Sequence, residues 1–250
     1  DFMILKIFKK LFFIFFPKNF VGTSNSKTRN QWLEEKLKNV PPGSKILDAG
    51  AGDGNKKKFC EHLDYISQDI AEYDGIQEDE GLQTGKVDYT NLDIVSDISN
   101  IPLQDKSLDA ILCVEVIEHI PNPLEAFMEF SRLLKQDGIV ILTAPFNSLT
   151  HYAPYHYSTG FSKYYYEKHL PEFNFEIVEI TPNGNFFEYL AQEVRRTNEV
   201  AKTYNQNKFI GFYFIIGKLL ILRSLKKLSK NDNNSSELLC FGFNVIARKL

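Results

Sequence analysis

Three apolar runs in the first half of the chain end in acidic or glycine-rich segments that could bind a polar ligand. The first run leads into Asp48-Ala49-Gly50-Ala51-Gly52-Asp53-Gly54, and the second ends at Asp69-Ile70. The third ends at Asp97-Ile98. In open α/β sheets the carboxyl ends of parallel strands meet at one edge, where ligands bind. We therefore expect these three segments to form one site.

Each segment suits a different part of a nucleoside-like ligand. The small residues at 49–54 let a ligand approach the backbone closely, and Asp48 favours a cationic group such as an amine or a sulfonium. Asp69 can accept hydrogen bonds from two ribose hydroxyls, whereas Asp97 can accept from an exocyclic amine while Ile98 covers a flat ring. Taken singly, the aspartates could equally cap a helix or form turns. Their joint position at three strand ends favours a binding site.

The glycine-rich loop departs from two common phosphate-binding patterns. A dinucleotide-binding fingerprint requires a third glycine at the position of Asn55, and a phosphate-binding loop requires a lysine followed by a hydroxyl residue. Neither pattern is present at residues 48–59. This argues against hydride transfer with a dinucleotide and leaves a cationic ligand as the preferred one.

Apolar runs alternate with helical patterns around these segments. Strands are expected at 45–50, 63–70, 92–98, 108–116, 138–146, 173–180 and 238–250. A helix is expected between the fourth and fifth strands, with Asn122 as its N-cap, Pro123 at its first position and Gly138 after its end. The alternation predicts a doubly wound α/β sheet with right-handed crossovers.

These motifs resemble those of the class I S-adenosylmethionine-dependent methyltransferases, including the type found in quinone biosynthesis. "ILDAGAGDG" is similar to the first motif of that family, "SQDI" to its ribose-binding motif, and the stretch from "SDISNIPL" to "LTAPF" to its later motifs. The resemblance implies S-adenosylmethionine as cofactor and a Rossmann-like fold: a seven-stranded, mostly parallel sheet with an antiparallel last strand and helices on both faces. The residues that it assigns to cofactor binding are Asp48, Ala49, Gly50, Ala51, Gly52, Gly54, Asp69, Ile70, Asp97, Ile98 and Glu115.

The acceptor-binding residues are expected in segments added after the fifth strand. Residues 148–173 carry His151 and His156, which are the candidate catalytic bases, among several tyrosines suited to sugars or other polar rings. This segment and the one after it resemble methyltransferases of surface-glycan synthesis, which implies O-methylation of a sugar in a surface polysaccharide or glycolipid. The alternative is that these side chains only pack within a lid.

Two other functions are compatible with the sequence. Glu115, Glu118 and His119 stand at helical spacing and resemble the metal-binding clusters of metal-dependent quinone and RNA 3′-end methyltransferases. His151 or His156 could complete such a site for Mg²⁺ or a similar ion. Because the same string occurs in family members without a metal, where the first glutamate faces the cofactor, we expect no metal. The other possibility is a non-catalytic protein that binds the cofactor as an assembly partner.

Composition sets limits on partners and location. The net charge of -3 argues against nucleic-acid binding, and the three widely spaced cysteines indicate reduced thiols of a cytoplasmic protein. Residues 3–16, within an N-terminal segment 1–28, and residues 208–228 are basic and hydrophobic but too interrupted to span a bilayer. Both suit peripheral contact with the inner face of the membrane, or internal packing. A single methyltransferase domain is expected at 29–250, with acceptor-binding insertions at 148–172 and 184–236.

Overall fold

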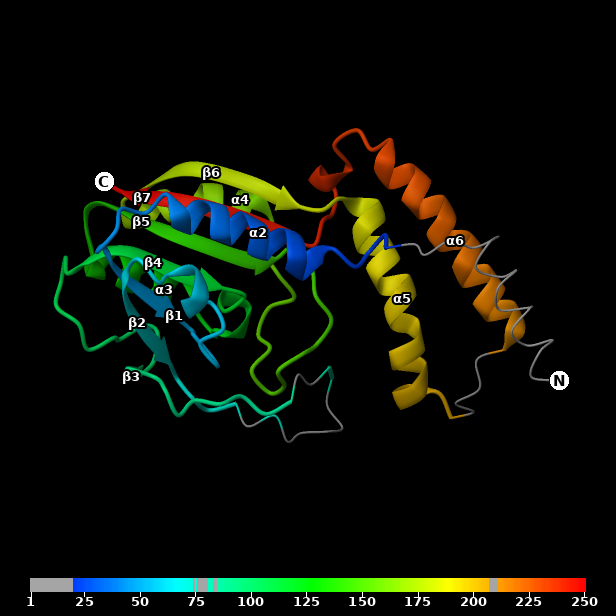
Figure 1. Ribbon diagram of the computed structural model, residues 1–250, viewed down its shortest axis with the longest axis horizontal. Helices are drawn as coiled ribbons and strands as arrows, with labels where there is room; N and C mark the ends of the chain where they lie inside the picture. Colours follow the sequence, from blue (N-terminus) through cyan, green and yellow to red (C-terminus); the bar gives the residue numbers. More distant parts are fainter. Residues whose placement is uncertain (1–19, 74, 76–80, 83–84, 207–210) are drawn as a thin grey trace. The chain divides into compact units, whose positions relative to one another are not determined.

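The computed structural model describes residues 20–73, 75, 81–82, 85–206 and 211–250 (Figure 1). These residues form two compact units, one of residues 27–183 with 241–250 and the other of residues 20–26 with 184–240. The insertion expected at 184–236 falls within the second unit. The amphipathic segment expected at 3–16 lies outside the described residues.

In the described part of the chain, the first unit is built on a seven-stranded sheet, which confirms the expected fold. The strand order is β3-β2-β1-β4-β5-β7-β6 (Figure 1). Neighbouring strands from β3 to β5 are parallel, whereas β7 runs antiparallel to both β5 and β6. The strands are β1 Lys45–Ala49, β2 Asp64–Asp69, β3 Ile94–Val95, β4 Leu108–Val114, β5 Leu134–Pro145, β6 Phe175–Asn183 and β7 Gly242–Lys249.

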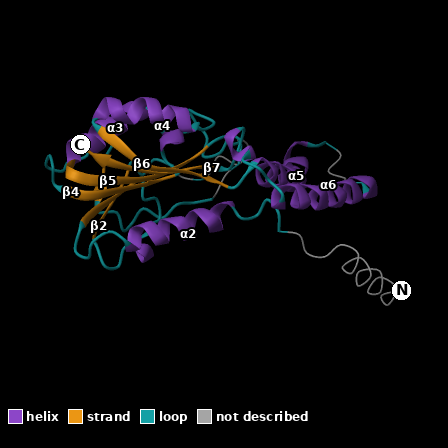
Figure 2. Cartoon of the chain, turned by 90° about the horizontal axis from the view of Figure 1, so that it is seen from above, coloured by secondary structure: helices purple, strands orange, loops and turns teal. Residues whose placement is uncertain are grey.

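Helices cover both faces of this sheet, with α2 on one face and α3 and α4 on the other (Figure 2). Leu33 and Leu37 of α2 pack in one cluster with Ile46 of β1 and Leu112 of β4. The central strands are therefore covered on both sides, which explains their continuous apolar runs. The α-helices within the described residues are α2 Asn25–Lys38, α3 Pro123–Leu133, α4 Lys163–His169, α5 Phe186–Tyr204 and α6 Phe212–Lys230.

The third strand is shorter than the expected 92–98, because only Ile94–Val95 pair with β2. The Asp93 carboxylate accepts hydrogen bonds from the Ser67 N–H at 2.8 Å and from the Ser67 hydroxyl at 2.7 Å. The Asp93 side chain therefore occupies the Ser67 N–H, which the backbone of a longer β3 would otherwise use as its donor. On the other side of β3, Asp97 accepts from the Ser99 N–H at 2.8 Å and turns the chain away.

The helix before β5 ends earlier than Gly138 predicts. β5 begins at Leu134, directly after the last residue of α3. Leu134 pairs with Leu108 of β4, and the ladder resumes only at Ile139. The residues between them form a bulge that contains Gly138. The glycine thus marks an irregularity in a strand and not the end of a helix.

The second unit consists mainly of the helices α5 and α6, with a 3₁₀ turn at Ser235–Glu237. Glu188 of α5 accepts hydrogen bonds from the Gly22 N–H at 2.6 Å and from the Ser229 hydroxyl at 3.2 Å. Among the helices that the structure describes, none combines the length and the apolar character needed to cross a bilayer. The buried apolar side chains shared by the elements of this unit are Val21, Ala191, Leu222 and Leu225.

A buried carboxylate anchors the segment that follows β3. Glu129 of α3 accepts hydrogen bonds from the Ile101 N–H at 2.7 Å and from the Arg132 guanidinium at 2.6 Å. Arg132 also donates to the carbonyls of Ile101 and Leu103 and to the Asp105 carboxylate. This network holds residues 101–105 against α3 and thereby limits where the preceding turn can lie.

We expect the substitution Glu129→Ala to lower the free energy of unfolding by about 3 kcal/mol, because it leaves a buried N–H and a partly buried guanidinium without their shared acceptor. Glu125→Ala, on the exposed side of the same helix, is the matched control and should change it by less than about 0.5 kcal/mol. Urea unfolding followed by circular dichroism measures both values. Equal losses in the two variants would contradict the anchoring role.

Candidate functional site

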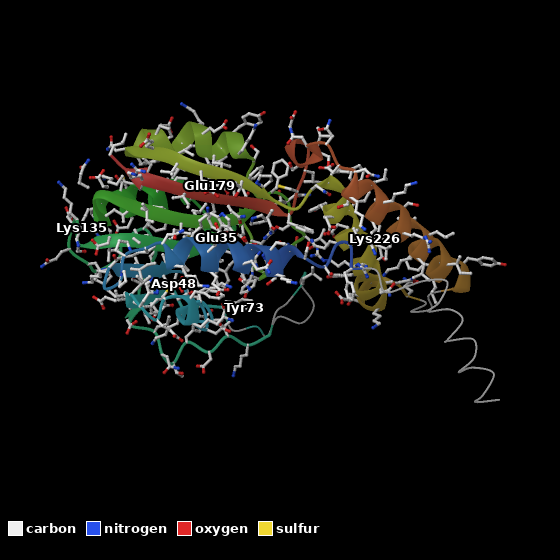
Figure 3. All side chains as sticks on the ribbon, turned by 45° about the horizontal axis from the view of Figure 1, so that its top comes forward. Glu35, Asp48, Tyr73, Lys135, Glu179 and Lys226 are labelled. Carbon is white, nitrogen blue, oxygen red and sulfur yellow. The ribbon has the colours of Figure 1, made fainter. Side chains whose placement is uncertain are left out.

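A cavity of about 710 Å³ lies at the carboxyl ends of β1, β2 and β4. Its lining residues come largely from the stretches 48–56, 68–73 and 114–121, which follow these strands. Asp48 and Tyr73, both labelled in Figure 3, are among them. Because β1 lies between β2 and β4, this is the switch point at which α/β folds bind ligands. The volume falls in the range of about 300–1,000 Å³ that is usual for small-molecule sites.

The glycine-rich loop after β1 is held by the end of β2. The Gly50 N–H donates to the Gln68 carbonyl at 2.8 Å, and the Gly52 N–H donates to the Asp69 carboxylate at 2.9 Å. Gly50 has a φ of 77°, and a Cβ at this position would lie 2.5 Å from a methyl group of Val116. Only glycine fits there without displacing the turn after β4. The loop therefore lines the cavity with backbone atoms.

The two acids expected to bind ribose and adenine both line the cavity. Asp69 ends β2, and its second carboxylate oxygen accepts from the Ala71 N–H at 2.9 Å. Asp97 lies two residues beyond β3 and is exposed, whereas Ile98 beside it is buried. A carboxylate has about four acceptor positions, so each acid keeps lone pairs for a ligand.

Asp48 differs from the other acids of the cavity because it is buried. Asp48 is 1% exposed, and its carboxylate accepts a hydrogen bond from the Tyr65 hydroxyl at 2.6 Å. Burial raises the pKa of Asp48 to about 6 and outweighs the opposing effect of that hydrogen bond. Asp48 still lines the cavity, where its ionised form favours a cationic ligand.

Glu115 stands at the turn after β4 in a left-handed backbone conformation, with a φ of 56°. Its carboxylate forms an ion pair with Arg29 of α2 at 2.7 Å and accepts from the Thr143 hydroxyl at 3.0 Å. Glu115 and Arg29 both line the cavity. Strained conformations that the surroundings hold in place are concentrated at functional sites, so this turn is a candidate part of the site.

The helical metal-binding face that was the alternative for Glu115, Glu118 and His119 does not form. The chain leaves β4 through the left-handed turn, and Ile117–His119 make a single 3₁₀ turn and not an α-helix. Glu115 is engaged by Arg29, while Glu118 is fully buried. Burial, with the charge of Glu115 as the second cause, raises the pKa of Glu118 well above its ordinary value. The i, i+3, i+4 spacing does not place these side chains on one face, because the segment is not an α-helix.

Three histidines from two segments gather beside the cavity. His119 ends the 3₁₀ turn after β4, and His151 and His156 belong to the connection between β5 and α4. The ring centroids of His119 and His151 are 4.7 Å apart, and those of His151 and His156 are 4.9 Å apart. Burial lowers the pKa of His119 to about 4, so its ring is neutral at physiological pH.

The connection that carries these histidines is tied to the turn after β4. The N–H groups of Tyr157 and Ser158 both donate to the Glu118 carbonyl at 3.1 Å. The ring of Tyr152 packs against the rings of Tyr73 at 4.3 Å and His119 at 5.0 Å between centroids. One side of the cavity is therefore aromatic, in contrast to the backbone-rich loop after β1.

The cavity has an excess of acidic groups. Acidic side chains attract cations most strongly where water is partly excluded, so this lining favours a positively charged ligand. Of the described residues that line the cavity, six are acidic and three carry a lysine or arginine charge: Asp48, Asp53, Asp69, Glu72, Asp97 and Glu115 against Arg29, Lys56 and Lys86.

Most of the expected site residues come together in this cavity, although their roles stay predictions. Sequence reasoning missed Arg29, because nothing in its own segment marks a residue that α2 carries to the site. It considered His119 only as part of a helical metal face. The expected residues that line the cavity are Asp48, Gly50, Ala51, Gly52, Asp69, Ile70, Asp97, Ile98, Glu115 and His151, whereas Ala49, Gly54 and His156 are not among its lining residues.

Comparison with known proteins identifies the region around this cavity. Residues 47–142 match the family described as methyltransferase domain. The ubiquinone biosynthesis O-methyltransferase of Dechloromonas aromatica is 29% identical over 119 residues, which are 46% of this chain and 49% of that protein. The chain thus matches about half the length of this curated relative.

Solved structures share the fold at low sequence identity. A SAM-dependent methyltransferase from Archaeoglobus fulgidus aligns with a TM-score of 0.52 and 18% identity, covering 90% of this chain and 97% of that one. Phosphoethanolamine N-methyltransferase 2 of Haemonchus contortus, in complex with S-adenosylmethionine, aligns with a TM-score of 0.50 and 15% identity, covering 88% and 52%.

The region that matches the methyltransferase domain contains the parts of the cavity that the fold brings together. It includes the glycine-rich loop, Asp69 at the end of β2, Asp97 and the turn at Glu115. The part of the chain that lines most of this cavity is therefore similar to a methyltransferase domain, and one of the solved structures with the same fold contains S-adenosylmethionine.

Proposed function

We propose that the chain transfers a methyl group from S-adenosylmethionine to a hydroxyl group of a small, ring-shaped acceptor. The observation that carries this proposal is that one cavity combines the glycine-rich loop and Asp69 with an aromatic side that includes His151 and Tyr152. Methyl transfer is a displacement that needs the two reactants aligned in one site. A cavity with two chemically different sides supports such an alignment.

The loop side of the cavity offers a partner for each polar part of the cofactor. Asp69 can accept from both ribose hydroxyls, and Asp97 can accept from the adenine amine beside Ile98. The acidic excess suits the ammonium and sulfonium groups, while the Arg29 guanidinium suits the carboxylate. When bound, the cofactor supplies a methyl group on positively charged sulfur, and the S–CH₃ electron pair returns to sulfur as the acceptor oxygen takes the methyl group.

His151 is the candidate base for the proton of the acceptor hydroxyl. Its Nδ1 lies 2.9 Å from the Leu149 carbonyl, which can only accept, so Nδ1 carries the proton and Nε2 keeps its lone pair. Nε2 can therefore take the hydroxyl proton as the oxygen attacks. His156, the other expected base, does not line the cavity, and both of its ring nitrogens are buried. We propose that it supports His151 and does not contact the acceptor.

The aromatic side of the cavity suits a ring-shaped acceptor. Tyrosine rings pack on the apolar face of a sugar or a phenol, and their hydroxyls can bond to its substituents. We propose a sugar of a surface polysaccharide or glycolipid, as the tyrosine-rich segment suggested. A phenolic ring is the second candidate, because the curated relative from Dechloromonas aromatica is named for ubiquinone biosynthesis.

The substitution Asp69→Asn should weaken S-adenosylmethionine binding by roughly 10- to 100-fold, because it removes a charged acceptor of the ribose hydroxyls. Isothermal titration calorimetry measures the affinity. Asp64→Asn is the matched control, since Asp64 is exposed at the opposite end of the same strand. Unchanged affinity in the Asp69 variant would sink the ribose assignment.

Transfer itself is tested with methyl-labelled S-adenosylmethionine, offered with fractionated glycolipids, glycans, phenolic quinone precursors and RNA in separate reactions. We expect a labelled methyl ether on a sugar hydroxyl, located by mass spectrometry. His151→Asn should abolish the product while leaving cofactor affinity within about twofold, because His151 is assigned to the acceptor. The control is His169→Asn, at a partly exposed histidine paired with Glu172.

The same experiment separates the alternatives. Label on a phenol would show that the acceptor is a phenolic ring and not a sugar. Label on RNA would overturn the proposal of a small-molecule acceptor. Cofactor binding without transfer to any fraction would favour the non-catalytic function.

We also propose that α6 contacts an anionic membrane surface from the cytoplasmic side. Its outer side exposes Tyr213, Leu220 and Ile221, with exposed fractions from 49% to 89%, while Leu222 packs into the core of its unit. Lys226, labelled in Figure 3, belongs to a run of basic residues near the end of this helix. Apolar and basic side chains on one helix are the pattern of an interfacial helix.

The double substitution Leu220→Asp with Ile221→Asp should reduce co-sedimentation with anionic vesicles by about tenfold or more. It removes two apolar side chains that would be buried when α6 binds the membrane. Leu238→Asp is the control, since Leu238 is 73% exposed in the same unit but lies outside α6. Binding should be weaker to neutral vesicles. Equal binding of all three proteins to anionic vesicles would refute the contact through α6.

A further inference from the structure

His119, His151 and His156 form a cluster for which proton transfer alone gives no reason, because one base is enough. One ring nitrogen from each lies within 4.8 Å of those of the other two. Within the described ranges, no other group of three or more histidine, cysteine or carboxylate side chains is gathered in this way. Such convergence of nitrogen atoms points to a shared ligand.

Backbone carbonyls fix the proton on two of the three rings. His119 Nδ1 contacts the Tyr155 carbonyl, and His151 Nδ1 lies 2.9 Å from the Leu149 carbonyl. Because a carbonyl can only accept, each Nδ1 carries the hydrogen and each Nε2 keeps a lone pair. Histidines that bind metals are oriented by this kind of hydrogen bond from the second ring nitrogen.

Polar atoms beside these two rings are buried without hydrogen-bond partners. In the part of the chain that the structure describes, this holds for both ring nitrogens of His156 and both carboxylate oxygens of Glu118. The Glu118 side chain is 1% exposed, and one of its oxygens lies 3.7 Å from His119 Nε2. Burying such groups without hydrogen-bond partners is unfavourable. A bound cation would satisfy the nitrogen atoms and compensate the carboxylate.

We propose that His119, His151 and His156 bind a divalent transition-metal ion, with Zn²⁺ as the best match. Three imidazoles are the ligand set of Zn²⁺ sites that keep one position open, whereas Mg²⁺ prefers oxygen ligands. The proposal departs from the expected absence of a metal. It also moves the site away from Glu115, whose carboxylate is engaged by Arg29.

Binding requires a small closure of the cluster. Nitrogen atoms bound to one Zn²⁺ at about 2.0–2.1 Å lie roughly 3.4 Å apart. The histidine nitrogens are within 4.8 Å of one another, so they need to approach by up to roughly 1.4 Å. Rotation of the His151 and His156 side chains can supply a movement of this size.

If the proposed methyl transfer is correct, the ion would activate the acceptor. His119 and His151 both line the cavity, so an open coordination position would be accessible to an acceptor hydroxyl there. Coordination lowers the pKa of a bound hydroxyl, which releases its proton to water. The oxygen then bonds to the methyl carbon while the S–CH₃ electron pair returns to sulfur. In this scheme His151 binds the ion and does not take the proton.

The test measures metal binding directly. Wild-type protein is treated with a chelator and titrated with Zn²⁺ and with Co²⁺, whose visible absorption reports a four-coordinate site. We expect one ion per chain and no comparable binding of Mg²⁺. His151→Asn with His156→Asn should weaken Zn²⁺ binding by about 100-fold or more, because two of three ligands are lost. His169→Asn, at a partly exposed histidine outside the cluster, is the control.

Binding that is lost in the double variant and kept in the control supports the site. Binding that is equally weak in all three proteins overturns it. Thermal melting and cofactor affinity report whether the double variant folds, and His119→Gln provides a second variant if it does not.

Methyl transfer by a metal-free protein would refute the metal's role in activating the acceptor but leave the proposed function intact. A metal-bound protein that transfers no methyl group to any acceptor would overturn the proposed function but not the metal site.

Discussion

Three hydrogen bonds at the end of β2 determine the shape of the loop on which the site depends. The Gln68 carbonyl accepts the N–H groups of Gly50 and Ala51 at 2.8 and 2.9 Å, and the Asp69 carboxylate accepts the Gly52 N–H at 2.9 Å. Asp69 therefore shapes the loop and faces the cavity with the same carboxylate. These bonds make the ends of β1 and β2 one rigid element, which the position of a cofactor requires.

A second set of backbone bonds attaches the aromatic side of the cavity to the same edge of the sheet. The Glu118 carbonyl accepts the N–H groups of Tyr157 and Ser158, and the Tyr155 carbonyl contacts His119. Glu118 and His119 follow β4, which is the strand next to β1. The connection after β5 is therefore positioned by β4. The two sides of the cavity are thus set relative to each other by neighbouring strands of one sheet and not by a separate lid.

The sequence predicted the elements that depend on contiguous residues. It did not predict the contacts between residues that are distant in the chain and close in the fold. The first, second and fourth strands were found because each is a continuous apolar run that ends at a glycine or an acid. The length of the third strand was overestimated because the Asp93 carboxylate accepts a hydrogen bond from a backbone N–H of β2. Nothing in the sequence signals this contact. Arg29 was missed for the same reason, since α2 brings it in. His119 was paired with His151 or His156 in sequence, but the gathering of all three rings depends on the connection after β5. The helical face at Glu115 failed because its left-handed backbone breaks the assumed period.

The charge of the cavity indicates which side has to supply catalysis. An excess of carboxylates stabilises the sulfonium of the bound cofactor, and it favours this cation over the neutral thioether that remains after transfer. Positive charge is dispersed in the transition state, so this attraction acts mainly on the ground state and does not by itself accelerate the reaction. The loop side therefore provides binding and orientation. For the proposed hydroxyl acceptor, the rate would then depend on how readily the acceptor loses its proton, and the candidate groups for that step are the histidines on the aromatic side.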